Sequence, residues 1–127
     1  MAIQVRWEST ARNAIYLEIQ RGWTWPDLHE AIHQADQLIT SVPHTVHLLI
    51  DIRKAGGLPR DFMTAAGDIF AQGEARTNEG QKIVIGAGML IRAAYSGFLA
   101  VYGRQLQGRP FIFADSLDEA RAMVGAK

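Results

Sequence analysis

A seven-residue segment, residues 22–28 (GWTWPDL), marks the point where a strand passes into a helix. Thr24 is a residue type that accepts a hydrogen bond from the first turn of a helix, and Asp27, three residues on, completes a variant of the capping box. Trp23 stands in the position of a hydrophobic staple, and Pro26 falls in the first turn, where its missing N–H does no harm. The segment therefore predicts a strand before it and a helix that begins at about residue 25.

The length and composition are those of one globular domain. Of the 127 residues, 48% are hydrophobic and 20% are charged, which is enough to bury a core. Thirteen basic and thirteen acidic residues cancel, so no net charge attracts nucleic acid or an anionic membrane. The chain has no cysteine, which excludes disulfides and thiolate metal sites.

Two further patterns bear on localisation. The first residues, MAIQVR, lack the basic region and the long apolar region of a signal peptide. The most apolar stretch, Ile83 to Tyr102, is interrupted by Arg92 and by glycines, so it does not have the composition of a membrane span. We expect one cytoplasmic domain covering residues 1–127, with no membrane span and no nucleic-acid partner.

Segments with the period of a strand alternate with segments with the period of a helix. Residues 3–7 and 14–20 alternate apolar with polar side chains and predict a hairpin. Residues 46–52 are apolar and β-branched almost throughout, which is typical of a strand buried on both faces. The remaining predicted elements are helices at about 25–41, 62–73 and 89–106, strands at 82–85 and 110–114, a turn at 77–80, and a final helix opened by a capping box from Ser116 to Glu119. The fold class is α/β, in the order β-β-α-β-α-β-α-β-α, with a mixed, mostly parallel five-stranded sheet flanked by helices.

Ligands of such sheets usually bind outside the carboxyl ends of the strands. Here those ends are followed by a glycine-hinged, cationic loop at residues 53–60 and by the short loop at residues 86–88. A solvated surface loop is the alternative interpretation, although loops on a rigid scaffold often carry function. The predicted ligand-binding or partner-binding residues are Asp51, Arg53, Lys54, Gly56, Gly57, Arg60, Gly86, Gly88 and Arg92.

Gly86-Ala87-Gly88 follows a predicted strand and opens a helix, like the start of a dinucleotide-binding motif. The third glycine of that motif is missing, because Ile91 occupies its position. One interpretation is a sharp turn that lets helix and strand approach closely. The other is a small anion site, in which free N–H groups at the helix start act together with Arg92.

The segment from His29 to His33 (HEAIH) matches the H-E-x-x-H pattern of zinc hydrolases. His29 and His33 lie one helical turn apart, but both fall on the solvent-facing margin of the predicted helix, and no third ligand is specified. They are weak metal candidates, and zinc hydrolysis is the minor alternative. Ser9 and Ser96 have no recognisable base partner, so the sequence gives no support for nucleophilic catalysis. We expect no cofactor.

The predicted helix at 89–106 is apolar on more than one side. Ile91, Tyr95 and Phe98 follow helical spacing, while Leu90 and Leu99 flank this stripe. The surplus of apolar surface predicts either a lipophilic cavity between this helix and the sheet or a self-association face.

The element order, the GWTW segment at 22–25, the strand ending at Asp51 and the tail FADSLDEA at 113–120 resemble the STAS-like fold of sulfate-transporter and anti-sigma-factor-antagonist domains. The chain is most similar to the small stand-alone bacterial proteins of that group, over nearly its whole length. The resemblance implies a single, non-catalytic STAS-like domain at residues 1–127, which binds a protein partner or a small ligand through the loops after the central strands.

Regulatory members of that group carry a phosphorylatable serine or threonine in the loop after the strand that matches residues 48–51. Here that loop has no hydroxyl residue before Thr64, so the resemblance does not extend to a phosphorylation switch. The main hypothesis is a regulatory module that binds a protein partner and acts as a homodimer. The alternative is a carrier of a small amphiphile or anion, held between the helix at 89–106 and the sheet.

Overall fold

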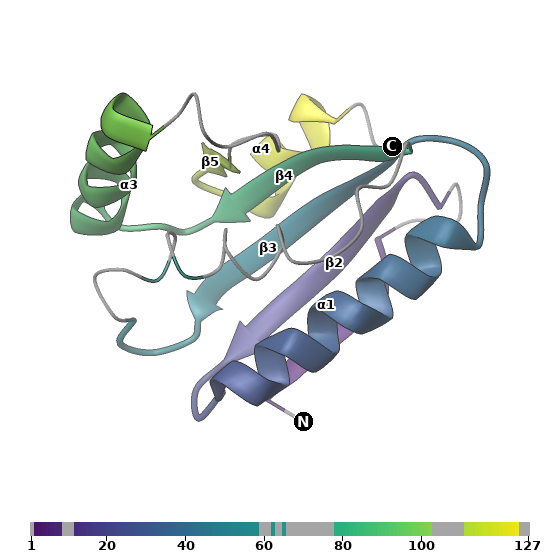
Figure 1. Cartoon of the computed structure of the whole chain (residues 1–127), viewed down its shortest axis with the longest axis horizontal. Coiled ribbons are helices and arrows are strands. Elements are labelled where there is room, and N and C mark those ends of the chain that lie inside the picture. The colour runs from purple at the N-terminus through teal and green to yellow at the C-terminus, as the bar shows by residue number, and fades with distance from the viewer. Residues whose placement is uncertain are drawn as a thin grey trace.

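The computed structural model describes residues 2–8, 12–58, 62, 65, 78–102 and 111–124 (Figure 1). Its elements are β1 (Ile3–Trp7), β2 (Ala14–Gln20), α1 (Trp25–Thr40), β3 (Val46–Lys54), β4 (Glu79–Ile85), α3 (Met89–Tyr102), β5 (Phe111–Ala114) and α4 (Leu117–Met123). Of the predicted helix at 62–73, only residues 62 and 65 are described; the predicted end of the third helix at 103–106 and Arg60 lie outside the described residues.

The five strands form one sheet in the order β1-β2-β3-β4-β5. β1 runs antiparallel to β2, and each later pair is parallel. The prediction of an α/β fold with a mixed, mostly parallel five-stranded sheet is therefore confirmed. Because β2 to β5 point the same way, their carboxyl ends lie along one side of the sheet, which we name the carboxyl edge.

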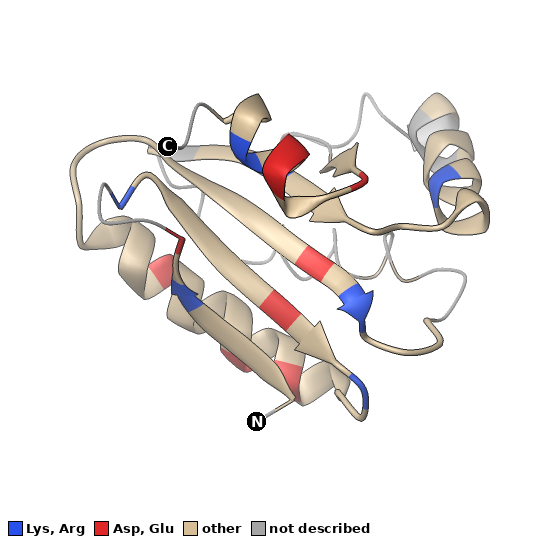
Figure 2. Ribbon diagram, turned by 180° about the vertical axis from the view of Figure 1, so that it is seen from behind, with Lys and Arg blue, Asp and Glu red and all other residues tan. Residues whose placement is uncertain are grey.

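The two faces of the sheet are covered differently. On the first face, α1 buries Leu28, Ile32 and Ile39 against apolar side chains of β1 to β3. On the second face, Ala120 of α4 packs with side chains of β2 to β5, including Tyr16. No described helix lies over the carboxyl half of β2 and β3 on this second face (Figure 2).

The junction before α1 forms as predicted. The Thr24 hydroxyl accepts a hydrogen bond from Asp27 N at 3.3 Å, and the Asp27 carboxylate accepts one from Thr24 N at 3.0 Å. These reciprocal bonds complete the capping box. The start of α1 is thereby fixed next to the end of β2 at the carboxyl edge.

Two predicted strand boundaries are wrong. β3 continues to Lys54, so Arg53 and Lys54 belong to the strand, because the pairing of β2 with β3 extends past an irregularity to Gln20 and Lys54. β4 begins at Glu79, inside the predicted turn at 77–80. The Asn78 side-chain amide donates to the carbonyls of Ile39, Val42 and His44, at 2.8, 3.0 and 3.1 Å. Asn78 thus anchors the chain directly before β4, and pairing with β3 begins at once.

The cap of α4 also differs from the prediction. The Ser116 hydroxyl accepts a hydrogen bond from Glu119 N at 3.1 Å, which is half of a capping box. The Glu119 carboxylate instead accepts from Asp115 N, one residue before the cap, at 3.2 Å. Among the described residues, the helices are all too short or too polar to cross a bilayer.

Candidate functional site

Asp51 is the centre of the candidate site at the carboxyl edge. Its side chain is 2% exposed, and it accepts from Arg53 Nη2 at 2.7 Å, from Arg53 Nε at 3.0 Å and from Arg53 N at 3.0 Å. Burial raises the pKa of Asp51, but the hydrogen bonds from Arg53 and Tyr16 and the charge of Arg53 outweigh it, so the pKa lies below its ordinary value. The side chain of Arg53 is therefore held in one orientation.

Arg53 lies directly on Gly86, at the end of β4. A Cβ atom placed on Gly86 would lie 2.3 Å from Cγ of Arg53, and the φ of Gly86 is +87°. Both the close approach and the backbone conformation require a residue without a side chain. The structure thus brings together the predicted residues Asp51, Arg53 and Gly86.

Tyr16 and Glu18 of β2 join this group, and sequence reasoning missed both. Glu18 and Asp51 are partners across the parallel β2–β3 pair, so their side chains share one face of the sheet, the second face, on which Tyr16 lies. The Tyr16 hydroxyl donates to Asp51 Oδ2 at 2.5 Å, and its oxygen lies 3.1 Å from Oε2 of Glu18. We name Tyr16, Glu18, Asp51 and Arg53 the carboxylate cluster.

The other carboxylate oxygen of Glu18 also has partners. Gln20 Nε2 donates to Glu18 Oε1 at 2.8 Å, and Lys54 Nζ lies 3.7 Å from the same oxygen. The hydrogen bond from Gln20 lowers the pKa of Glu18, burial opposes it, and the Tyr16 hydroxyl adds to the lowering. Burial, followed by the hydrogen bond to Asp51, raises the pKa of Tyr16 well above its usual range. At neutral pH the carboxylate cluster therefore holds two carboxylates and a neutral tyrosine.

These pKa directions predict how stability depends on pH. The pKa values of Asp51 and Glu18 are lowered by folding, so both groups stabilise the fold above their unfolded values of about 4, and that contribution is lost as the pH falls through the folded values. Tyr16→Phe removes a hydrogen-bond donor to the Asp51 carboxylate. We expect it to lower the free energy of unfolding by about 1.5–3 kcal/mol at pH 7. Urea unfolding at pH 7 and pH 3 should show this cost shrinking in acid.

Tyr95→Phe is the matched control, because the Tyr95 hydroxyl accepts from Phe111 N at 2.9 Å. Its cost should be the same at both pH values. An equal cost of Tyr16→Phe at pH 7 and pH 3 would show that the tyrosine does not stabilise the ionised carboxylates.

Arg92 connects α3 to the end of β5. Its Nη2 lies 2.8 Å from Asp115 Oδ1, its Nε donates to the Ala87 carbonyl at 3.0 Å, and the guanidinium lies 5.2 Å from the centre of the Phe113 ring. Gly88 has open space around it, and its carbonyl accepts from Arg92 N at 3.0 Å. Arg92 and Gly88 thus order the start of α3, and the charge of Arg92 is already paired.

The first two residues of α3 expose large apolar side chains. Met89 is 88% exposed and Leu90 is 75% exposed. Both come directly after the loop that follows β4, so they lie at the carboxyl edge, as the end of β3 does. Lys54 adds a cation that is 70% exposed. We name Arg53, Lys54, Met89 and Leu90 the edge surface.

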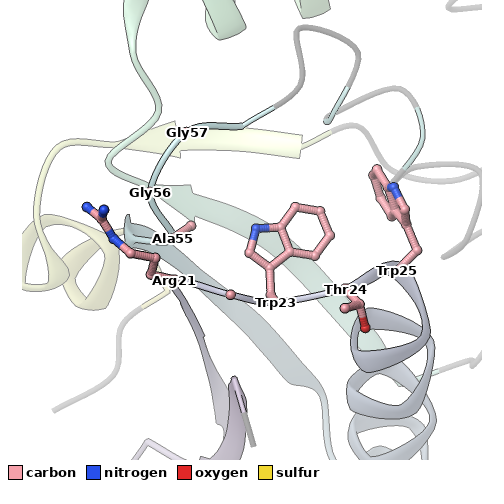
Figure 3. A pocket seen from close by; sticks show the side chains of 8 residues that line it. Arg21, Trp23, Thr24, Trp25, Ala55, Gly56 and Gly57 are labelled. Atoms are coloured by element: carbon pink, nitrogen blue, oxygen red, sulfur yellow. The ribbon is translucent and has the colours of Figure 1, made fainter.

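A pocket lies at the same edge, between the end of β2 and the residues after β3 (Figure 3). Its volume is about 340 Å³. The residues that line it are Arg21, Gly22, Trp23, Thr24, Trp25, Ala55, Gly56 and Gly57. Gly56 and Gly57 are among the predicted site residues, whereas Trp23 and Trp25 are not. We name this the tryptophan pocket.

His29 and His33 lie exposed on α1. His33 Nε2 is 3.3 Å from Gln37 Nε2, one turn further along the helix. Within the part of the chain that the structure describes, no three side chains of the types that bind metals come together. The H-E-x-x-H segment therefore has no third ligand among these residues.

Comparisons with known proteins identify no relative. A scan of family models finds no match to this chain, and a search of curated proteins finds none either.

Proposed function

We propose that this chain is a non-catalytic interaction module of the STAS-like type, which binds a protein partner through the edge surface. The observation that carries the proposal is the exposure of Met89 and Leu90 on the first turn of α3. Its regulatory role and its cytoplasmic location belong to the same proposal. The α/β fold and its mixed, mostly parallel sheet support the proposal at the level of fold class.

Met89 and Leu90 have the character of the centre of a protein interface. Burying one such side chain contributes about 1.5–3 kcal/mol. Arg92 lies in the first turn of the same helix, and its Nε donates a hydrogen bond to the carbonyl of Ala87, in the loop before the helix. The apolar side chains are therefore presented from a fixed backbone, and little conformational entropy is lost when a partner covers them.

Arg53 and Lys54 give this apolar centre a cationic rim. The side chain of Arg53 is 45% exposed although Asp51 holds it in place, and that of Lys54 is 70% exposed. Interfaces commonly combine an apolar core with a charged rim, and the rim selects partners of opposite charge. The proposed partner therefore presents an apolar surface bordered by acidic side chains.

The test is a quantitative pull-down from a lysate of the source organism. The variants are Met89→Gln/Leu90→Gln and Lys54→Glu, with His29→Gln/His33→Gln on exposed α1 as the matched control. A protein enriched by the wild type and by the control should fall about tenfold or more with either edge variant. Circular dichroism should show that all four proteins are folded.

Two outcomes would overturn the proposal. One is the recovery of the same proteins by all four baits. The other is the recovery of nothing beyond the bare resin. Sedimentation of the same four proteins measures self-association, and a dimer lost only in Met89→Gln/Leu90→Gln would identify a second copy of the chain as the partner.

A further inference from the structure

The tryptophan pocket is separate from the edge surface and uses different side chains. It is formed where two neighbouring parallel strands end, so the segment after β2 and the segment after β3 make opposite walls (Figure 3). Its volume of about 340 Å³ is at the lower end of the range of ligand pockets, which runs from about 300 to 1,000 Å³. A molecule of one or two rings matches that size.

One wall of the pocket is aromatic. The Trp23 and Trp25 rings meet edge to face with centroids 4.9 Å apart, and both rings pack on the buried ring of Phe62, at 5.5 and 6.1 Å. Both tryptophans remain only partly buried. Their indole surfaces are thus held in place by packing and still reach the pocket, which favours a planar aromatic guest.

The end of the pocket away from Trp25, where Arg21 meets Gly56 and Gly57, carries hydrogen-bond donors and a positive charge. The side chain of Arg21 runs along Gly56, with Cγ 3.5 Å and Nε 3.6 Å from where a Cβ would lie. Gly56 has a φ of +81°. Among the described residues, none accepts a hydrogen bond from the Arg21 guanidinium or from the N–H groups of Gly56 and Gly57. These donors favour an anion.

We propose that the tryptophan pocket binds a small planar aromatic anion. The ring of the ligand lies against the indole of Trp23, and its carboxylate or phosphate faces Arg21 and the Gly56–Gly57 backbone. Arg21, Trp23, Gly56 and Gly57 all line this one pocket, and Figure 3 shows Trp23 between Arg21 and Trp25. A cationic ligand is disfavoured because it would face the Arg21 guanidinium. This inference does not depend on the protein partner.

The experiment is a nitrogen–proton NMR titration of the whole chain that follows the indole N–H signals of its three tryptophans. The probe is 1-naphthoate, and the neutral comparison is 1-naphthamide. The signals of Trp23 and Trp25 should shift with a Kd in the millimolar range or tighter, and the signal of Trp7 on β1 should not. Arg21→Gln should weaken naphthoate binding about tenfold, to the affinity of the amide.

Arg12→Gln is the matched control, because Arg12 is an exposed arginine before β2, at the opposite edge of the sheet. It should bind naphthoate like the wild type. Three results would overturn the inference: no shift of Trp23 and Trp25 at saturating probe, equal shifts of all three tryptophans, or the same affinity for naphthoate and naphthamide. If Arg21→Gln bound naphthoate as tightly as the wild type does, the contact assigned between the anion and Arg21 would be wrong.

Discussion

Asp51→Ala is expected to lower the free energy of unfolding by about 2–4 kcal/mol. Removing one member of a buried ion pair costs about 3–5 kcal/mol when the remaining charge stays buried. Arg53 is 45% exposed and regains water, which reduces this cost. Tyr16, which is 3% exposed, loses its closer acceptor and adds to the cost. Urea unfolding followed by circular dichroism measures the change.

Asp115→Ala is the matched control, because Asp115 also pairs with an arginine but is 81% exposed. Its cost should stay below about 1 kcal/mol. If Asp51→Ala cost no more than Asp115→Ala, the carboxylate cluster would not stabilise the carboxyl edge. Arg53 would then not be held by Asp51 in solution.

Gly86→Ala is expected to lower the free energy of unfolding by about 2–4 kcal/mol. The left-handed backbone conformation alone costs an L residue about 1–2 kcal/mol. The added methyl group would also lie 2.3 Å from Cγ of Arg53, an atom close to the main chain that cannot simply rotate away while Asp51 holds the guanidinium. The same unfolding measurement gives the cost.

A double variant separates the two parts of this cost. Arg53→Ala/Gly86→Ala removes the close contact but keeps the backbone conformation, so Gly86→Ala should cost only about 1–2 kcal/mol in that background. Gly88→Ala, which meets no atom within 4 Å, should change stability by less than about 1 kcal/mol. Equal costs at Gly86 and Gly88 would contradict the contact between Arg53 and Gly86.

Local sequence patterns were sufficient to predict most of the fold. The apolar period and the capping residues around Thr24 identified α1, and the alternation of strands with helices identified a mostly parallel sheet. The errors arose where distant contacts decide a boundary. Asn78 starts β4 through bonds to carbonyls 34 to 39 residues away, and no local pattern contains that information.

The candidate site was predictable in part. Asp51, Arg53 and Gly86 were expected at one edge because parallel strands end together. Tyr16 and Glu18 were missed because alternating polar residues on a strand normally face solvent, and only the register of β2 against β3 places Glu18 beside Asp51. The exposure of Met89 was not predictable either, because it depends on which other elements pack against the start of α3.

The most direct test of the partner-binding edge is site-specific photo-crosslinking in the source organism. A photoreactive phenylalanine analogue at position 89 tests the edge surface, and the same analogue at position 30, exposed on α1, is the control. We predict that position 89 crosslinks a discrete protein and that position 30 does not. The same crosslinked protein from both positions, or none from position 89, would contradict the account.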